Sequence, residues 1–110
     1  MKGSEHYVKK DIKLLLQRYG AYFHMPVKKA IGTATVDFLC CVRGRFVAIE
    51  TKAPGGRLTG RQKAILHTVR GAGGIAFFCS SAAEAEKILE AEIGPVGDLV
   101  DEIKRRRVGE

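Results

Sequence analysis

Two apolar segments separated only by Arg43-Gly44 constrain the fold of this chain more than any other feature of its sequence. Residues 36–42 and 45–52 are rich in Val, Phe, Ile and Cys, which favour β-strands. A two-residue connection with glycine second is typical of a tight hairpin turn. The sequence therefore predicts an antiparallel hairpin, and because both strands are apolar on both sides, we expect them to be covered on both faces.

This turn would decide which side chains of the hairpin face one another. If Val42 pairs with Arg45, then Asp37 lies directly across from Glu50, on the same face of the sheet. Lys52 is two residues beyond Glu50 and shares that face. The other residues expected on this face are Leu39, Cys41, Phe46 and Ala48, and those expected on the opposite face are Val36, Phe38, Cys40, Val47 and Ile49. Two carboxylates and an ammonium are thus predicted to meet at one end of an apolar surface.

The rest of the chain has the spacing of helices and of two further strands. Apolar residues three and four positions apart predict helices over 4–19, 59–70, 81–91 and 96–107. Strands are predicted over 21–25 and 75–79, and a basic loop over 28–32. The predicted order is helix, three strands, helix, strand, helix, and the candidate helix over 96–107 follows last. This order predicts an α/β fold with a mixed central β-sheet flanked by helices on both faces.

Length and charge restrict the class of protein further. A chain of 110 residues suits a single domain, 1–110, and leaves no room for a second. The formal net charge of +7 suggests a polyanionic partner, most often a nucleic acid and sometimes an acidic membrane surface. The alternative is a protein that is merely basic.

The cysteines and the termini indicate where the protein works. An odd count of three cysteines fits disulfides poorly, and Cys40, Cys41 and Cys79 all lie in apolar runs. We expect three small buried side chains in a reducing cytoplasm. No apolar stretch is long enough to span a membrane, and the N-terminus lacks the apolar middle of a signal peptide. The expected location is therefore the cytoplasm, with no membrane partner.

The predicted pair of carboxylates has a chemical consequence. Adjacent carboxylates repel one another, and a divalent cation with oxygen ligands, such as Mg²⁺, relieves the repulsion. Such an ion can generate a hydroxide nucleophile and neutralise charge on a phosphodiester, while Lys52 orients water or stabilises the developing charge. The alternative is an ion pair at a sheet edge, in which Lys52 only offsets Glu50. The apolar strands on both sides favour the metal site.

Glu5 and Gln62 each allow two interpretations. Glu5 falls on the apolar stripe of the first helix, where a carboxylate is expected to be paired or bound to a metal. An acidic residue in a first helical turn is also favoured by the helix dipole alone. Gln62 completes a capping box with Thr59, yet it also lies on the inner side of its helix, within reach of a metal site or a phosphate.

At this point the residues resemble the VRR-NUC (virus-type replication-repair nuclease) family of the PD-(D/E)xK nuclease superfamily. The resemblance runs from Gly32 to about Ser81, through G-TATV-D, RGRFVAIETK, APGGRLTGRQKAIL and GAGGIAFFCSS. A bare D…ExK pattern is common by chance. The Gly-Gly-Arg-Leu loop after IETK, the helix with Gln62 and the glycine-strand-serine block make the pattern specific.

The resemblance implies a restriction-endonuclease-like core and a DNA nuclease that depends on Mg²⁺ or Mn²⁺. It implies that Asp37 and Glu50 are metal ligands, with the backbone carbonyl of Thr51 as a third, and that Lys52 is the catalytic lysine. Gln62 would match the family's helix glutamine among the catalytic residues, and Glu5 the acid of the first helix. Val36 stands at the nominal proline position of the superfamily motif, a common departure.

The resemblance also suggests a substrate and an assembly. Stand-alone domains of this length look like phage proteins, which would place this one in the host cytoplasm. They are similar to archaeal Holliday junction resolvases, which form homodimers and cut branched DNA. Two symmetric sites in such a dimer would nick two strands of a four-way junction.

Basic residues around the predicted site fit binding to DNA phosphates without sequence choice. The candidates for DNA contact are Lys28, Lys29, Arg57, Arg61 and Lys63, with Arg70 and the basic end 104–107 nearby. A solvated surface charge is the alternative for each one taken singly.

Three hypotheses therefore follow from the sequence. The leading one is a homodimeric, metal-dependent endonuclease acting on branched DNA. The second is a monomeric flap, exonucleolytic or restriction-type nuclease. The third is a DNA-binding module without catalytic activity.

Overall fold

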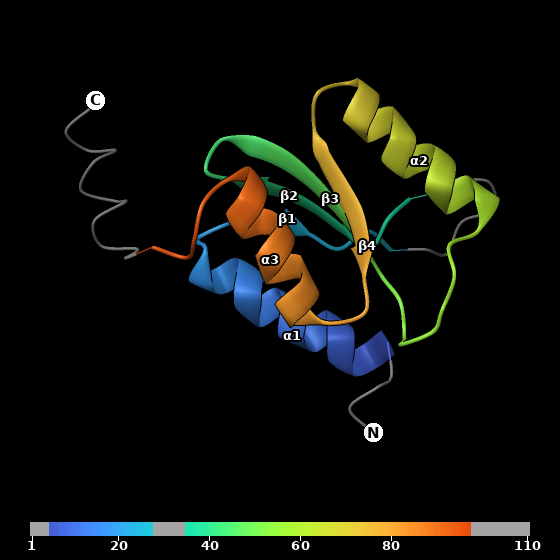
Figure 1. Ribbon diagram of the computed structural model, residues 1–110, viewed down its shortest axis with the longest axis horizontal. Coiled ribbons are helices and arrows are strands. Elements are labelled where there is room, and N and C mark those ends of the chain that lie inside the picture. Colours follow the sequence, from blue (N-terminus) through green and yellow to red (C-terminus); the bar gives the residue numbers. More distant parts are fainter. Residues whose placement is uncertain (1–4, 28–34, 98–110) are drawn as a thin grey trace.

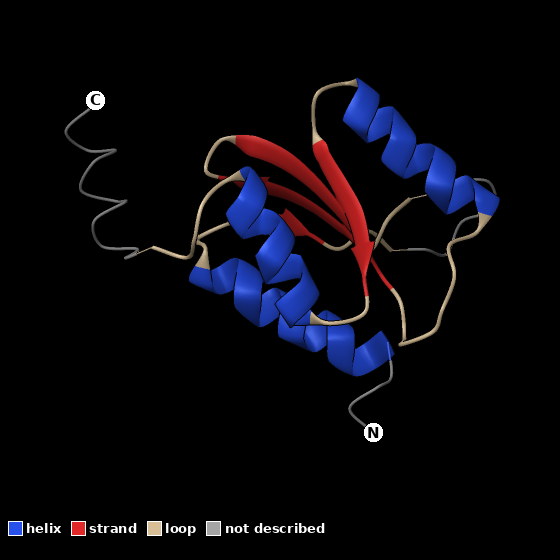
Figure 2. Ribbon diagram, in the orientation of Figure 1, coloured by secondary structure: helices blue, strands red, loops and turns tan. Residues whose placement is uncertain are grey.

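The predicted hairpin lies in the middle of the sheet in the computed structural model, which describes residues 5–27 and 35–97 (Figures 1 and 2). Its strands are β2 (Phe38–Val42) and β3 (Arg45–Thr51). Both turn residues have left-handed backbone, with φ of 50° at Arg43 and 83° at Gly44, which is the requirement of a type I′ turn. The pairing runs from Val42↔Arg45 to Phe38↔Ile49, so the predicted register is confirmed.

One strand is added on each side of this hairpin. The sheet order is β1-β2-β3-β4, with β1 (Tyr22–His24) antiparallel to β2 and β4 (Ile75–Cys79) parallel to β3. Two parallel neighbours require a crossover connection, and α2 (Gly60–Gly71) provides it. The mixed sheet expected from the sequence is therefore present.

Helices cover the sheet on both faces, as predicted. α1 (Glu5–Arg18) and α3 (Ala82–Glu92) lie side by side on one face, and α2 lies on the other (Figure 1). The larger core forms under α1 and α3, because the helical stripe of Val8, Ile12 and Leu16 meets the strand residues that point to that side. The smaller core under α2 consists of Val36, Ala48, Leu66 and Ala76.

The predicted helix and strand bounds agree with the structure to within about two residues wherever both can be compared. The helix predicted over 96–107 and the basic loop over 28–32 fall almost entirely outside the described residues. Among the described helices, none is long and apolar enough to cross a membrane.

Two expectations about the hairpin faces are wrong. Val36 packs with Ala48 and Leu66 under α2, on the face opposite to the one predicted. Strand alternation does not apply to Val36, because β2 begins only at Phe38 and the chain bends at Asp37. In addition, the α2 face is not covered along its whole length. Phe46 is 50% exposed, because one helix covers this face where two cover the other.

The cysteines divide into two kinds. Cys40 and Cys79 are buried, and burial raises the pKa of each thiol from 9.0 to about 12. Cys41 is exposed, so the prediction of three buried thiols is wrong for this residue. Because side chains alternate along β2, Cys41 points to the face opposite the larger core, whereas its neighbours Cys40 and Val42 belong to that core.

We predict that a thiol-reactive dye modifies one cysteine rapidly in the folded protein and all three after unfolding in urea. Cys40 and Cys79 are shielded and hold their protons, whereas Cys41 is accessible. Absorbance of the released dye measures the stoichiometry, and Cys41→Ser should abolish the rapid phase. Rapid modification of two or more thiols in native protein would contradict this arrangement of the sheet.

Candidate active site

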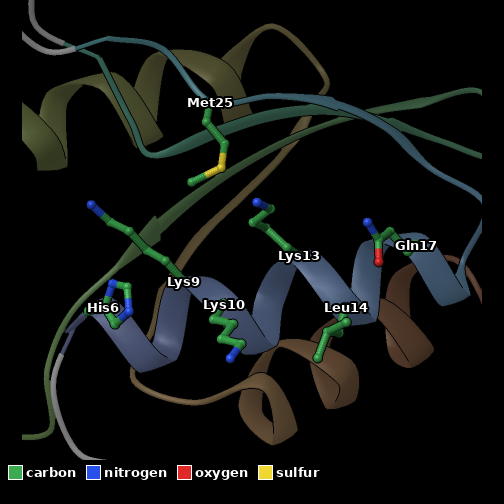
Figure 3. A pocket seen from close by; sticks show the side chains of 7 residues that line it. All are labelled: His6, Lys9, Lys10, Lys13, Leu14, Gln17 and Met25. Atoms are coloured by element: carbon green, nitrogen blue, oxygen red, sulfur yellow. The ribbon is translucent and has the colours of Figure 1, made fainter.

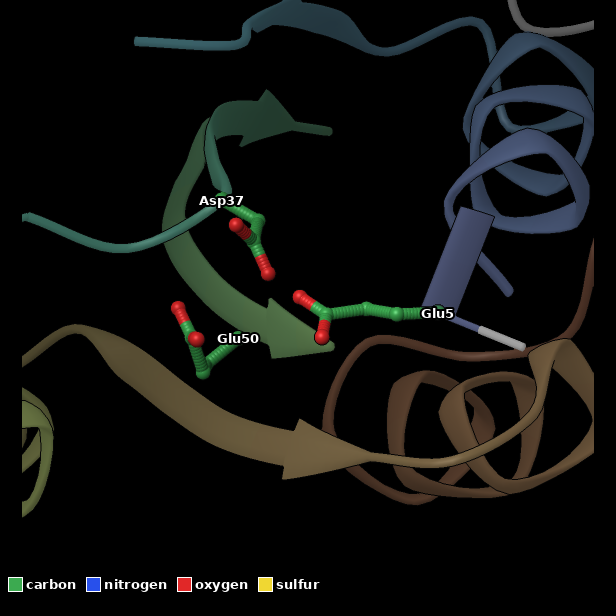
Figure 4. A group of neighbouring side chains, drawn as sticks. All are labelled: Glu5, Asp37 and Glu50. Carbon is green, nitrogen blue, oxygen red and sulfur yellow. The ribbon is translucent and has the colours of Figure 1, made fainter. Parts of the chain in front are cut away.

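Three carboxylates from three separate elements meet at the carboxyl end of β3. Glu5 is the first residue of α1, Asp37 directly precedes β2, and Glu50 lies within β3. One oxygen of each lies within 4.8 Å of the others, and Figure 4 shows the Glu5 side chain reaching from α1 toward the other two. Asp37 and Glu50 are 4% and 1% exposed, whereas the Glu5 side chain is 44% exposed. The predicted proximity of Asp37 and Glu50 is thus present.

Asp37 is fixed by Thr51. The backbone N–H of Thr51 donates to Asp37 Oδ2 at 2.8 Å, and its hydroxyl donates to the same oxygen at 2.7 Å. Asp37 directly precedes Phe38, whose pair with Ile49 is the last in the β2–β3 ladder. The two bonds from Thr51 therefore tie the chain before β2 to the end of β3. For Thr51, the family resemblance implied a role of the backbone carbonyl only. The sequence did offer a signal for this bond, because Thr51 places a hydroxyl, which needs a hydrogen-bond partner when buried, in the middle of the Glu-Thr-Lys motif.

Glu50 is fixed by Gln62. The Gln62 side-chain amide donates from Nε2 to Glu50 Oε2 at 2.6 Å. Its Oε1 accepts the backbone N–H of Thr59 at 2.9 Å, and the Thr59 hydroxyl accepts the Gln62 N–H at 3.2 Å. The capping box predicted for Gln62 is therefore present, and the same side chain also reaches the Glu50 carboxylate, whereas its role at a metal site stays a prediction. One amide side chain closes the capping box of α2 and holds the β3 carboxylate.

Two lysines lie against the carboxylates. Lys52 Nζ is 3.5 Å from Glu50 Oε2, and its side chain is only 15% exposed. Lys9 Nζ is 3.5 Å from Asp37 Oδ1 and 3.8 Å from Glu5 Oε1. Lys9 was not among the residues predicted for the site, although its position four residues after Glu5 places both side chains on one helical face. Both ammonium groups therefore offset negative charge of the carboxylates.

The cluster fits a divalent cation. With bonds of about 2.1 Å, the oxygen ligands of an octahedral Mg²⁺ are about 4.2 Å apart when opposite and about 3.0 Å apart when adjacent. The carboxylates are already within 4.8 Å, and the partly exposed Glu5 has freedom to close the difference. All three ligands are oxygen atoms, which hard cations prefer.

Of the basic residues expected to contact DNA or to lie nearby, some are exposed near the cluster and one forms a structural hydrogen bond. Arg57 and Lys63 are exposed and line one hollow of about 250 Å³, and Arg61 is exposed nearby on α2. Arg70 instead donates from Nε to the carbonyl of Ala76 at 2.7 Å, which ties α2 to β4. Lys28, Lys29 and the basic end 104–107 lie outside the described residues.

A VRR_NUC domain structure superposes with a TM-score of 0.66, covering 78% of this chain and 94% of that one at 21% sequence identity. The chain has the VRR_NUC fold. Its mixed sheet and three described helices are a PD-(D/E)xK-like core, as the resemblance of the hairpin and Gln62 helix implied. No family profile matches the chain, and no curated protein matches it either.

Within this VRR_NUC fold, we predict that Thr51→Val lowers the free energy of unfolding by about 1.5–3 kcal/mol, the value of a hydrogen bond to a buried charged group. The change keeps the shape of the side chain but removes the hydroxyl that donates to Asp37. Urea denaturation near neutral pH measures it. Thr68→Val is the matched control, because the Thr68 hydroxyl bonds a helix carbonyl at an exposed position. Equal stability losses in the two variants would contradict the role of Thr51.

Proposed function

We propose that this chain is a metal-dependent deoxyribonuclease of the VRR-NUC family that hydrolyses phosphodiester bonds in DNA. The observation that carries the proposal is the convergence of Glu5, Asp37 and Glu50 within 4.8 Å, beside Lys52, in a VRR_NUC fold. A buried acidic cluster with a lysine is a costly arrangement for stability alone.

Glu5, Asp37 and Glu50, with the backbone carbonyl of Thr51, would hold Mg²⁺ or Mn²⁺. Such an ion would supply Lewis acidity there and would make a water molecule more acidic near neutral pH. Thr51 and Gln62 hold Asp37 and Glu50 in fixed orientations, so two ligands are preorganised before substrate binds. Glu5 contributes an adjustable third ligand from the edge of the site.

Lys52 is the residue we assign to the reacting phosphate. Its ammonium lies beside Glu50 in a mostly enclosed position, where it can orient the attacking water and offset negative charge on the phosphate in the transition state. Gln62, which we grouped with the catalytic residues from sequence, is better described as a positioning residue. It acts through Glu50 and through the start of α2.

DNA is the substrate that the charge favours. The net charge of +7 and the exposed Arg57, Arg61 and Lys63 support contacts to phosphates rather than to bases. We assign Lys28 and Lys29 to the same task.

We extend the proposal to branched DNA cut by a homodimer, on the strength of the family resemblance.

The test is incubation of the protein with labelled four-way junctions, flaps and plain duplex in Mg²⁺ or Mn²⁺, with EDTA as a blank. We predict cleavage that depends on the metal and is fastest on junctions. Asp37→Asn and Lys52→Met should each slow it by about 10²- to 10³-fold, since each removes charge from the reacting centre. Arg45→Gln, at the opposite end of β3, should cut at the wild-type rate.

Absence of cleavage on every substrate by folded wild-type protein would defeat the nuclease proposal. So would an Asp37→Asn variant as active as the wild type. Sedimentation of the same samples tests the dimer, because a monomer that trims flaps or ends would replace the branched-DNA proposal with the monomeric alternative.

A further inference from the structure

A groove of about 570 Å³ runs along α1, and Met25, just after β1, also lines it (Figure 3). We call it the α1 groove, and its lining residues are His6, Lys9, Lys10, Lys13, Leu14, Gln17 and Met25. Three of these side chains are lysines and none is acidic. The formally charged side chains that line the groove are therefore all positive.

Lys9 belongs both to this groove and to the carboxylate cluster. It lines the groove, and its ammonium contacts Asp37 and Glu5. The groove thus begins at the candidate active site and extends away from it along α1. Figure 3 shows Lys9 and Lys13 extending on the side of the helix that faces Met25.

The dimensions suit a nucleic-acid backbone. At 1.5 Å per residue, the helix from His6 to Gln17 is about 16 Å long. One DNA strand carries a phosphate about every 3.4 Å along its axis, so this length corresponds to roughly four or five nucleotides. Lys9 and Lys13 are four residues apart and lie on one side of α1, about 6 Å apart along its axis.

We propose that the α1 groove binds the phosphate backbone of the DNA strand next to the scissile phosphate, with Lys10 and Lys13 as phosphate contacts and Lys9 at the entry to the site. This inference rests on the proposed nuclease function and adds a binding surface to it. The Arg57–Lys63 hollow would then hold DNA on the α2 side, and the α1 groove would hold it on the α1 side. The carboxylates lie between the two, where α1, β3 and the start of α2 meet.

The experiment compares two variants with the same loss of charge. Lys10→Gln/Lys13→Gln removes two groove lysines but leaves Lys9, which contacts Asp37. Arg45→Gln/Lys87→Gln removes two exposed cations outside the groove, one at the hairpin turn and one on α3. Fluorescence anisotropy with labelled duplex and four-way junction, in EDTA to prevent cleavage, gives the dissociation constants over a range of salt concentrations. Circular dichroism confirms that both variants are folded.

We expect the groove variant to bind about tenfold more weakly than the control variant near 0.1 M salt. The slope of log affinity against log salt should decrease in magnitude by about 1.4–1.8, the loss of two phosphate contacts. In Mg²⁺, its KM should rise while kcat stays near the wild-type value. In wild-type protein, bound DNA should protect Lys10 and Lys13 from acylation, read by mass spectrometry, and leave Lys87 reactive.

Equal affinity and equal salt slope in the two variants would overturn the groove assignment and leave the nuclease proposal intact. A changed sedimentation coefficient with unchanged DNA affinity would also overturn it, because the groove would then contact a second copy of the chain. Wild-type protein that neither binds nor cuts any of these DNAs would overturn the proposed function itself, and the groove inference with it.

Discussion

Asp37 and Glu50 are buried side by side at the end of β3, and the rest of the structure is arranged around this fact. Two carboxylates removed from water repel one another and lose hydration, which together cost several kcal/mol unless donors and cations compensate. Thr51 compensates Asp37 with two hydrogen bonds, and Gln62 compensates Glu50 with one. Lys9 and Lys52 supply positive charge on either side.

Each compensating group comes from an element that the fold needs for other reasons. The β2–β3 turn sets the register that brings Asp37 next to Thr51. The capping box that starts α2 also orients Gln62 toward Glu50. The first turn of α1 supplies Glu5, and its second turn supplies Lys9. The site is therefore rigid where β3 and α2 form it and adjustable where α1 does.

The sequence predicted those parts of the site that depend on local geometry. Arg43-Gly44 determined the turn, the turn determined the register, and the register placed Asp37 near Glu50. It did not reveal the Thr51 hydroxyl bond, because the bend at Asp37 takes this residue out of strand alternation. Lys9 was missed because its contact with Asp37 depends on how α1 packs against the sheet. Cys41 and Phe46 are exposed because α2 covers only part of one face of the sheet. The hairpin sequence alone does not indicate how far along that face α2 extends.

The proposed function requires the Glu5, Asp37 and Glu50 carboxylates to share one divalent cation. Anomalous diffraction from a crystal soaked in Mn²⁺ tests this directly, because it locates the ion without reference to activity. We predict a peak within bonding distance of Asp37 and Glu50 oxygens, and its disappearance in a crystal of the Asp37→Asn variant. A soaked wild-type crystal with no peak at the carboxylates, or with manganese bound only elsewhere on the molecule, would contradict the account.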